Sequence, residues 1–411
     1  GTKLVVANEG EMVGSVNPEG SISVIDFALS YADPTHTEVT FNRWDRRENV
    51  LRARGVLMTQ IEVGDAASVS EDLEPEYIAV STDGNFAYVS LQENNAIALV
   101  DLQRYVVRNI LPLGTVDFGS DQRLDASDED GPGGDGEINI TFEPGLFGLP
   151  QPDAIAVVPF NGTDYLLTAN EGDARDYEEL RLKDVGDPGE TMFTLGSVDP
   201  ALQADAELGR LEINLHVSDV DGDQALDTLA VFGGRNVNVY AAPVIGRFRQ
   251  VNSTRSDFED FIASTNSMFF NANNDENDSF ESRSDAKAGE PEALTVATLD
   301  GRTYAFVGLE RQSAIFVYDV TDPTQPVFQN LASNRNFVDA SGMLIGVGLD
   351  GSDVETDDGG DAVRANPAAG DLGPESIVFV PAADSPTGGA LIIVCNEVSG
   401  TVTVYSVLKG I

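Results

Sequence analysis

The sequence predicts an all-β fold, a β-propeller built from divergent four-stranded repeats. Its 411 residues exceed what one hydrophobic core normally supports, so the chain holds either several domains or a repeat with a distributed core. Residues 74–102 and 290–320 align almost without gaps. Each segment reads as a Pro-Glu start, an alternating strand, an Asp-Gly turn, a second apolar strand, a Glu-containing loop and a third strand. Period-two alternation between turn residues is typical of β-hairpins.

The same template recurs along the chain, which predicts a single propeller domain over residues 1–411. A meander of about four strands cannot bury both of its faces alone, and radial stacking of such sheets solves this problem. The chain starts abruptly inside a strand, so we expect an upstream segment of the same protein to close the ring. We expect seven blades in the intact protein, with eight as the alternative. Long acidic loops separate blade-like registers near residues 3–63, 74–115, 151–215, 226–255, 290–330 and 373–407.

The charge balance excludes several partners. The chain has 69 acidic and 24 basic residues and a formal net charge of -45, so a nucleic acid would be repelled. No stretch approaches the roughly 20 apolar residues that cross a bilayer. The single cysteine, Cys395, lies in the apolar run LIIVCN, and we expect it to be a buried small hydrophobe. Most of the acids are expected to form a solvated surface.

Acids recur at two fixed places in the repeats. Equivalent positions of successive blades form rings about a propeller axis, so the pattern predicts one or two rings of carboxylates near one mouth of the channel. The alternative for the first set is that each acid caps a strand and binds backbone amides of the neighbouring blade. Acids follow a proline at Glu76, Asp153, Glu292 and Glu375, and glutamates follow the second strand at Glu9, Glu93, Glu171, Glu310 and Glu397.

Nine short motifs are spread along the chain: ANEG, EPEYIAVS, LQENNAIALVDL, QPDAIA, TANEGDARDY, NDEN, GRTYAFVGLER, DLGPE and NEVSGTVTVY. In these motifs the chain resembles the bacterial choice-of-anchor I family, which is itself similar to mesenchyme-specific cell surface glycoprotein and to an atypical group of large alkaline phosphatases. The resemblance spans essentially the whole chain. It implies an exported propeller, secreted or at the cell surface, in an extracellular or periplasmic location. It does not supply an assigned reaction.

A metal-dependent phosphoesterase, like an alkaline phosphatase or phytase, is one hypothesis for the channel mouth. Such a site needs cations and arginines to hold phosphate oxygens, and acids that hold a metal. The alternative for each arginine is a buried partner that offsets repulsion between carboxylates. The residues expected to converge there are Glu171, Arg175, Arg235, Glu310 and Arg311.

Calcium is the expected cofactor. The stretch DVDGDQALD resembles a calcium loop, although flanking helices and a final bidentate glutamate are not evident. Two further loops, NANNDENDSFE and DASDEDG, also offer closely spaced oxygen ligands, and each could be an ordinary acidic turn. The expected ligands are Asp219, Asp221, Asp223 and Asp227 in the first loop, Asn273, Asp275, Asn277 and Glu281 in the second, and Asp125, Asp128 and Asp130 in the third.

Two hypotheses from different classes follow. The first is the calcium-dependent phosphoesterase, which acts on phosphorylated small molecules. The second is a non-catalytic cell-surface or extracellular module that uses calcium for rigidity and binds cell-surface or matrix components. Two distant histidines and one cysteine do not favour a zinc site, no Gly-x-Ser-x-Gly motif is present, and no glycine-rich loop opens a helix to bind a nucleotide.

Overall fold

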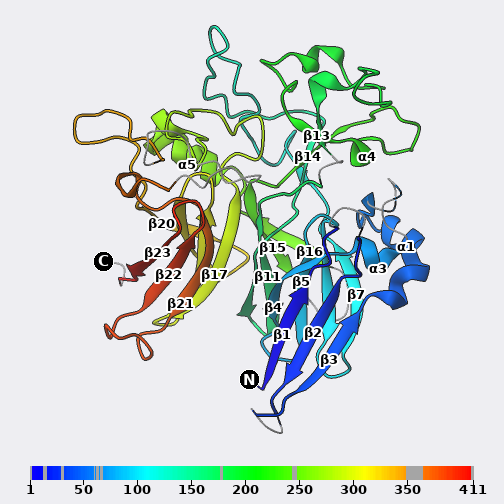
Figure 1. Cartoon of the computed structure of the whole chain (residues 1–411), viewed down its shortest axis with the longest axis vertical. Coiled ribbons are helices and arrows are strands. Elements are labelled where there is room, and N and C mark those ends of the chain that lie inside the picture. Colours follow the sequence, from blue (N-terminus) through cyan, green and yellow to red (C-terminus); the bar gives the residue numbers. More distant parts are fainter. Residues whose placement is uncertain are drawn as a thin grey trace.

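The protein folds as short β-sheets arranged about a common centre, with a smaller region attached at one end (Figure 1). The all-β prediction is confirmed, and the arrangement is that of a β-propeller. The count of seven blades, with eight as the alternative, stays a prediction. This computed structural model describes residues 2–12, 16–28, 32–59, 61, 64, 68–175, 179–242, 248–348 and 364–408.

Five antiparallel sheets form the propeller part of the described residues. Two of them have three strands: β1 (Lys3–Asn8), β2 (Ser21–Asp26) and β3 (Thr35–Thr40), and β21 (Pro374–Val380), β22 (Leu391–Asn396) and β23 (Thr401–Ser406). Two four-stranded sheets follow the chain in order: β4 (Pro75–Val80), β5 (Phe86–Leu91), β6 (Ala96–Asp101) and β7 (Val106–Pro112), and β17 (Pro291–Leu299), β18 (Arg302–Leu309), β19 (Ala314–Asp319) and β20 (Val327–Ser333). The fifth sheet joins β10 (Ile155–Phe160) and β11 (Thr163–Asn170) to β15 (Asn236–Ala241) and β16 (Arg249–Ser253).

The first strands of these sheets pack against one another in the order β1, β4, β10, β17 and β21. Hydrophobic cores therefore lie between neighbouring sheets rather than within one of them. Leu99 of β6 packs with Leu166 of β11 and Tyr240 of β15. Phe306 of β18 packs in the same way against Ile392 of β22. This shared burial is why the alternating strands need radial neighbours.

A separate sheet is built from two stretches of the chain, one before β10 and one between β11 and β15. It contains β8 (Val116–Asp117), β9 (Leu146–Leu149), β12 (Glu179–Arg181), β13 (Glu212–Asn214) and β14 (Leu229–Phe232), and β9 and β14 pair in parallel. Phe118, Leu182 and Leu226 belong to its own hydrophobic core. We call this sheet and its loops the insert. It lies at the upper end of the molecule in Figure 1.

The insert corrects two of the expected registers. Residues 151–215 and 226–255 were predicted as separate blades, but β11 and β15 pair directly, with Asn170 opposite Asn236. One blade therefore uses strands from both registers, and the chain leaves it after β11 to build part of the insert. The sequence pattern did not reveal this pairing, because a strand shows the same alternation whether its partner strand is near or distant along the chain.

Helices are short and lie outside the blades: α1 (Glu48–Arg52), α3 (Val69–Asp72), α4 (Leu215–Ser218) and α5 (Asp257–Thr265). The longest, α5, buries Phe258 and Ile262 against the core between the third and fourth blades. Within the described ranges, no helix has the length and apolar character needed to cross a membrane.

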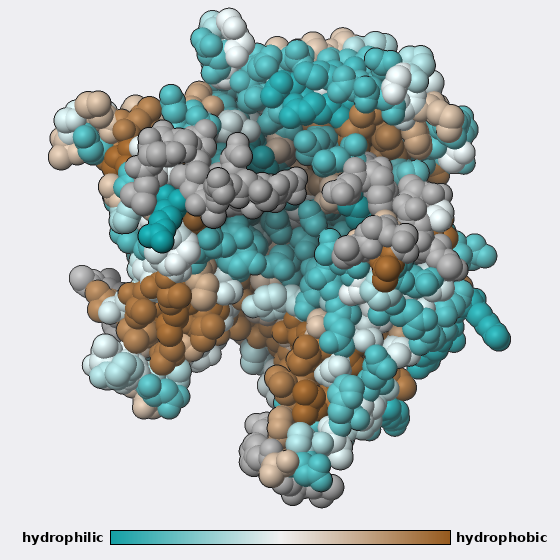
Figure 2. All heavy atoms as spheres, viewed as in Figure 1, coloured by the Kyte–Doolittle hydropathy of each residue, from teal (hydrophilic) through white to brown (hydrophobic). Residues whose placement is uncertain are grey.

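The two three-stranded sheets expose apolar side chains. Leu4 of β1 is 50% exposed, and Val402 of β23 is 65% exposed. Figure 2 shows a notch at the lower edge of the molecule with hydrophobic residues on both sides. Cys395 of β22 is also exposed, so its expected burial is wrong. It alternates with buried Val394 and Asn396 and therefore points to the uncovered face of this sheet.

Candidate functional site

The carboxylates that follow the second strand of each repeat are positioned by one type of turn. Four residues connect β5 to β6, β18 to β19 and β22 to β23, and in each turn the fourth N–H donates to the carbonyl of the first residue, at 2.8, 3.0 and 3.1 Å. Gln92, Glu310 and Glu397 are the first residues of these turns. Glu93 is the second, so its predicted equivalence with Glu310 is wrong by one position. Arg311 is the residue equivalent to Glu93.

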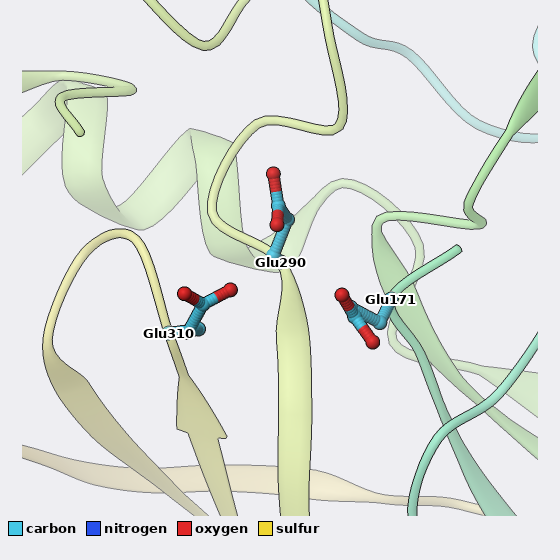
Figure 3. Close-up of side chains that lie close together, drawn as sticks. All are labelled: Glu171, Glu290 and Glu310. Atoms are coloured by element: carbon cyan, nitrogen blue, oxygen red, sulfur yellow. The ribbon is translucent and has the colours of Figure 1, made fainter. Parts of the chain in front are cut away.

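Three glutamates meet at the ends of neighbouring strands, and we call Glu171, Glu290 and Glu310 the mouth triad. Glu171 follows β11, Glu290 precedes β17 and Glu310 follows β18. Each offers a carboxylate oxygen within 4.8 Å of the others, and Figure 3 shows the three groups around a common space. Sequence reasoning paired Glu171 with Glu310 but missed Glu290. The sequence signal for Glu290 is its position directly before a Pro-Glu pair. Glu74 has the same position in the second register.

Three cations neutralise the mouth triad. Arg283, Lys287 and Arg311 approach the carboxylate of Glu290 to 2.5, 3.8 and 2.9 Å. Lys287 also lies 3.5 Å from Glu171, and Arg311 lies 3.1 Å from Glu310. Burial alone would raise the pKa of Glu290, but the positive charges of Arg283, Lys287 and Arg311 outweigh it and hold this pKa well below its usual range. The compensation is centred on Glu290, because burial raises the pKa of Glu171 to about 7 and the pKa of Glu310 well above its usual range although Lys287 and Arg311 lower them.

Arg175 lies beside a second pair of acids, Glu74 and Glu93. Its guanidinium donates to Glu74 at 2.6 and 3.1 Å, donates to the carbonyl of Asp72 at 3.1 Å and lies 3.9 Å from Glu93. Burial raises the pKa of Glu93 to about 8 even though Arg175 lowers it. Glu74 precedes its proline as Glu290 does, so the two strand starts bind arginine in the same way. A hydrogen bond of 3.0 Å from Gln92 to Glu171 joins this group to the mouth triad.

Arg235 lies elsewhere and corrects the expected convergence. It is buried and donates to the backbone carbonyls of Asp125, Ser284 and Ala286, at 2.6, 2.8 and 2.6 Å. It also forms an ion pair of 3.2 Å with Glu259 of α5. These contacts hold the insert against α5 and the loop before β17. Four of the five predicted residues thus belong to the mouth region, and Arg235 is a packing residue beneath the insert.

The acids that follow the prolines form an inner ring. Burial raises the pKa of Glu76, Asp153 and Glu292 above the usual range. Asp153 contributes to the shift of Glu76, and Glu375 contributes to the shifts of Asp153 and Glu292, so these carboxyl groups lie near one another. Glu375 is exposed, and this ring therefore faces solvent on one side.

The first expected calcium loop is an exposed turn of the insert. Asp219, Asp221 and Asp227 each place a carboxylate oxygen within 4.8 Å of the other two. Asp219 also accepts three backbone N–H groups of its own loop, which fixes its orientation. Asp223, the fourth expected ligand, is not part of this group, and its carboxylate accepts the N–H of Ala225 at 2.9 Å.

The second expected calcium loop holds an arginine. Arg335 donates to the carbonyl of Asn273 at 2.5 Å and to the side-chain oxygen of Asn277 at 2.9 and 3.1 Å. Burial lowers the pKa of Arg335 to about 9, although Asp275 raises it. A guanidinium thus takes the place expected for the metal at Asn273, Asp275 and Asn277. The sequence could not show this, because Arg335 is far along the chain.

Comparisons with known proteins identify relatives of this chain. Gigasin-3a of Magallana gigas is 29% identical over 216 residues, which cover 51% of this chain and 67% of that protein. The mesenchyme-specific cell surface glycoprotein of Strongylocentrotus purpuratus is 28% identical over 340 residues, which cover 74% of this chain. The chain spans only 43% of that glycoprotein.

Among solved structures, the periplasmic gluconolactonase PpgL of Pseudomonas aeruginosa aligns over 98% of this chain and 78% of its own, with 13% identity and a TM-score of 0.36. The β-propeller domain of Myceliophteria thermophila Cps50 (Swd1) aligns over 98% and 65%, with 5% identity and the same TM-score. The family model named choice-of-anchor I domain matches residues 1–323. The chain belongs to the choice-of-anchor I domain family.

Proposed function

We propose that this chain is an extracellular or cell-surface propeller module that binds calcium and does not catalyse phosphoester hydrolysis. One observation carries the choice between the two hypotheses. The three arginines expected to hold a phosphate each bind protein groups: Arg175 binds Glu74, Arg235 binds Glu259, and Arg311 binds Glu290. A phosphate would have to displace buried carboxylates from these guanidinium groups, which costs free energy.

The location rests on the family and on charge. One relative is described as a cell surface glycoprotein, and the net charge of -45 keeps such a surface soluble and hydrated. Extracellular calcium would screen part of this charge. The partners that fit an acidic, calcium-loaded surface are cell-surface or matrix components.

Calcium binding is placed in the Asp219 loop, with Asp219, Asp221 and Asp227 as ligands. The neighbouring charge of Asp223, followed by burial and the charges of Asp227 and Asp219, raises the pKa of Asp221. A divalent cation between these carboxylates would remove that repulsion. Calcium accepts such a set because it takes six to eight oxygen ligands in flexible geometry, including water.

The test is calcium titration by calorimetry on the chelator-treated chain, together with hydrolysis of para-nitrophenyl phosphate with and without calcium. We expect calcium binding that weakens at least tenfold in the double variant Asp221→Asn, Asp227→Asn. The matched control is Asp384→Asn, because Asp384 lies in an exposed turn outside the insert. We expect no hydrolysis above background. Calcium-dependent hydrolysis that is lost in Arg175→Ala or Arg311→Ala would overturn the proposal in favour of the phosphoesterase, and an unaltered affinity in the double variant would overturn the calcium site.

A further inference from the structure

A second group of oxygen-bearing side chains lies beneath the insert, away from the Asp219 loop and the mouth triad. It comprises Asp125, Glu259, Asn271 and Glu281, which we call the buried oxygen cluster. Glu259 is 2% exposed and the other three are 0% exposed. The residues come from three places: the loop before β9, helix α5 and the segment between α5 and β17.

Hydrogen bonds link the four residues, through the backbone N–H in the case of Asp125 and through the Ser284 hydroxyl in the case of Glu281. The carboxylate of Glu259 accepts the N–H of Asp125 at 3.2 Å and the amide of Asn271 at 3.3 Å. Asn271 also donates to the hydroxyl of Ser284 at 2.8 Å, and that hydroxyl donates to Glu281. The loop at Gly136 covers Glu281, since a Cβ at Gly136 would lie 3.0 Å from its Cγ. The group is thus one contiguous, enclosed unit.

Each member keeps one oxygen without a hydrogen-bond partner. These atoms are Asp125 Oδ1, Glu259 Oε2, Asn271 Oδ1 and Glu281 Oε1. An unsatisfied buried polar atom costs roughly 1–3 kcal/mol, and more when it is charged, so four of them in one connected group require an explanation. All four atoms are oxygens, and three belong to carboxyl groups. A divalent cation satisfies such a group and offsets its charge, and the alternatives are protons on the carboxyl groups or enclosed water that donates hydrogen bonds.

The local charges favour a cation of charge two. Three carboxylates face one guanidinium, that of Arg235, which pairs with Glu259. The largest causes of the pKa shifts at Asp125 and Glu281 include no positive charge. Burial, followed by the neighbouring acids, raises these values to about 7 and about 9. With all three acids ionised, the net charge of this group is two negative charges.

We propose that the buried oxygen cluster binds one divalent cation, calcium, which fastens the insert to α5 and to the segment before β17. Calcium matches a donor set made only of carboxylate and amide oxygens, whereas zinc prefers nitrogen and sulfur. The carboxylate triads already compact enough to hold an ion, within the described ranges, are the mouth triad and the Asp219 loop. The buried cluster must therefore contract on binding, which rotations of the long Glu259 and Glu281 side chains allow.

The site differs from the calcium loop in what the ion does. The Asp219 loop is exposed, so its ion exchanges quickly with solvent. An ion in the buried cluster leaves only when the insert loosens, and it should remain after brief treatment with chelator. Its loss leaves the carboxylates to repel one another or to take up protons, which weakens the junction between insert and propeller.

The test uses the whole chain carrying Asp221→Asn and Asp227→Asn, so that the exposed loop does not contribute. After long incubation with chelator, calcium is restored, bound calcium is measured by equilibrium dialysis with elemental analysis, and melting temperature is measured at pH 7.5. We expect one ion per chain and a higher melting temperature with calcium. Adding Glu281→Gln should abolish both. The matched control is Glu129→Gln in the neighbouring loop, which should change neither.

Melting temperatures measured without calcium distinguish a calcium ligand from a residue that only packs. Because no cation offsets Glu281 without calcium, adding Glu281→Gln to the chain with Asp221→Asn and Asp227→Asn should not lower the melting temperature in chelator. With calcium present, the same change should clearly lower it. A purely structural role would lower the melting temperature equally in both conditions and would overturn the proposal. Unchanged calcium stoichiometry in Glu281→Gln would overturn it as well.

Discussion

The mouth triad and the buried oxygen cluster contain the same number of carboxyl groups and differ in the cations around them. Arg283, Lys287 and Arg311 surround the mouth triad and lower the pKa of its central member, Glu290, whereas burial raises the pKa of Glu171 and of Glu310. One arginine serves the buried cluster, where the pKa of Glu281 is raised. The difference teaches that carboxylate number and proximity do not by themselves identify a metal site. We propose that the positive charge already supplied by the protein decides which of the two groups takes up a metal.

The largest effect is expected at the centre of the mouth triad. Glu290→Gln would leave three buried or half-buried cations around a neutral amide, and breaking a buried ion pair from one side costs about 3–5 kcal/mol. We expect a loss of this size in the free energy of unfolding, measured by urea titration. Glu190→Gln, on the exposed surface, is the control and should stay within about 0.5 kcal/mol. A loss at Glu290 no larger than that of the control would remove the distinction between the two regions.

A somewhat smaller effect is expected at Arg235, the cation of the buried cluster. Arg235→Met would remove the donor of three backbone carbonyls and the partner of Glu259. We expect a loss of roughly 2–4 kcal/mol by the same titration. Arg255→Met is the matched control, because Arg255 is 56% exposed and pairs with Asp121 at the surface. Equal losses in the two variants would argue against a structural role of Arg235.

The dependence of stability on pH gives the finest test of the comparison. In chelator, the folded pKa of Glu281, about 9, lies above the unfolded value of about 4.3, so the folded chain binds more protons between these limits. Stability is therefore fully present below about pH 4 and is lost as pH rises toward 9, at up to about 1.4 kcal/mol per pH unit for this group.

Replacing Glu281 by Gln should reduce that slope by about one proton, and calcium should flatten it in the parent chain. The measurement is the unfolding free energy in urea between pH 5 and 9, for both chains with and without calcium. Glu93 and Glu171 also have raised pKa values, so the difference between the chains isolates Glu281. Identical slopes in the two chains would contradict the assignment of an uncompensated acid there.

The sequence pattern predicted the four sheets whose strands follow one another along the chain, because their signal is local. Strand alternation, Asp-Gly turns and the Pro-acid starts all operate within one repeat, and the structure places Glu171 and Glu310 together as the repeat requires. The one-residue error at Glu93 was avoidable, since LQENNA and LERQSA align without a gap and pair Gln92 with Glu310.

Other features depended on contacts that no local pattern contains. Arg335 binds the asparagine loop from about 60 residues away along the chain. Asp125 meets Glu259 across 134 positions because the insert folds back over α5. The sequence identified Asp125 as a possible oxygen ligand but could not show its partners, which only the packing of the insert against α5 brings together.

The most direct test of the central claim is the calcium content of two single variants, Glu281→Gln and Glu310→Gln, measured by equilibrium dialysis beside the parent chain. Both changes neutralise one buried carboxyl group of a three-carboxylate cluster. If uncompensated charge marks the metal site, Glu281→Gln binds one calcium fewer than the parent, and Glu310→Gln binds the same number. The account is contradicted if Glu310→Gln loses an ion while Glu281→Gln retains the full number.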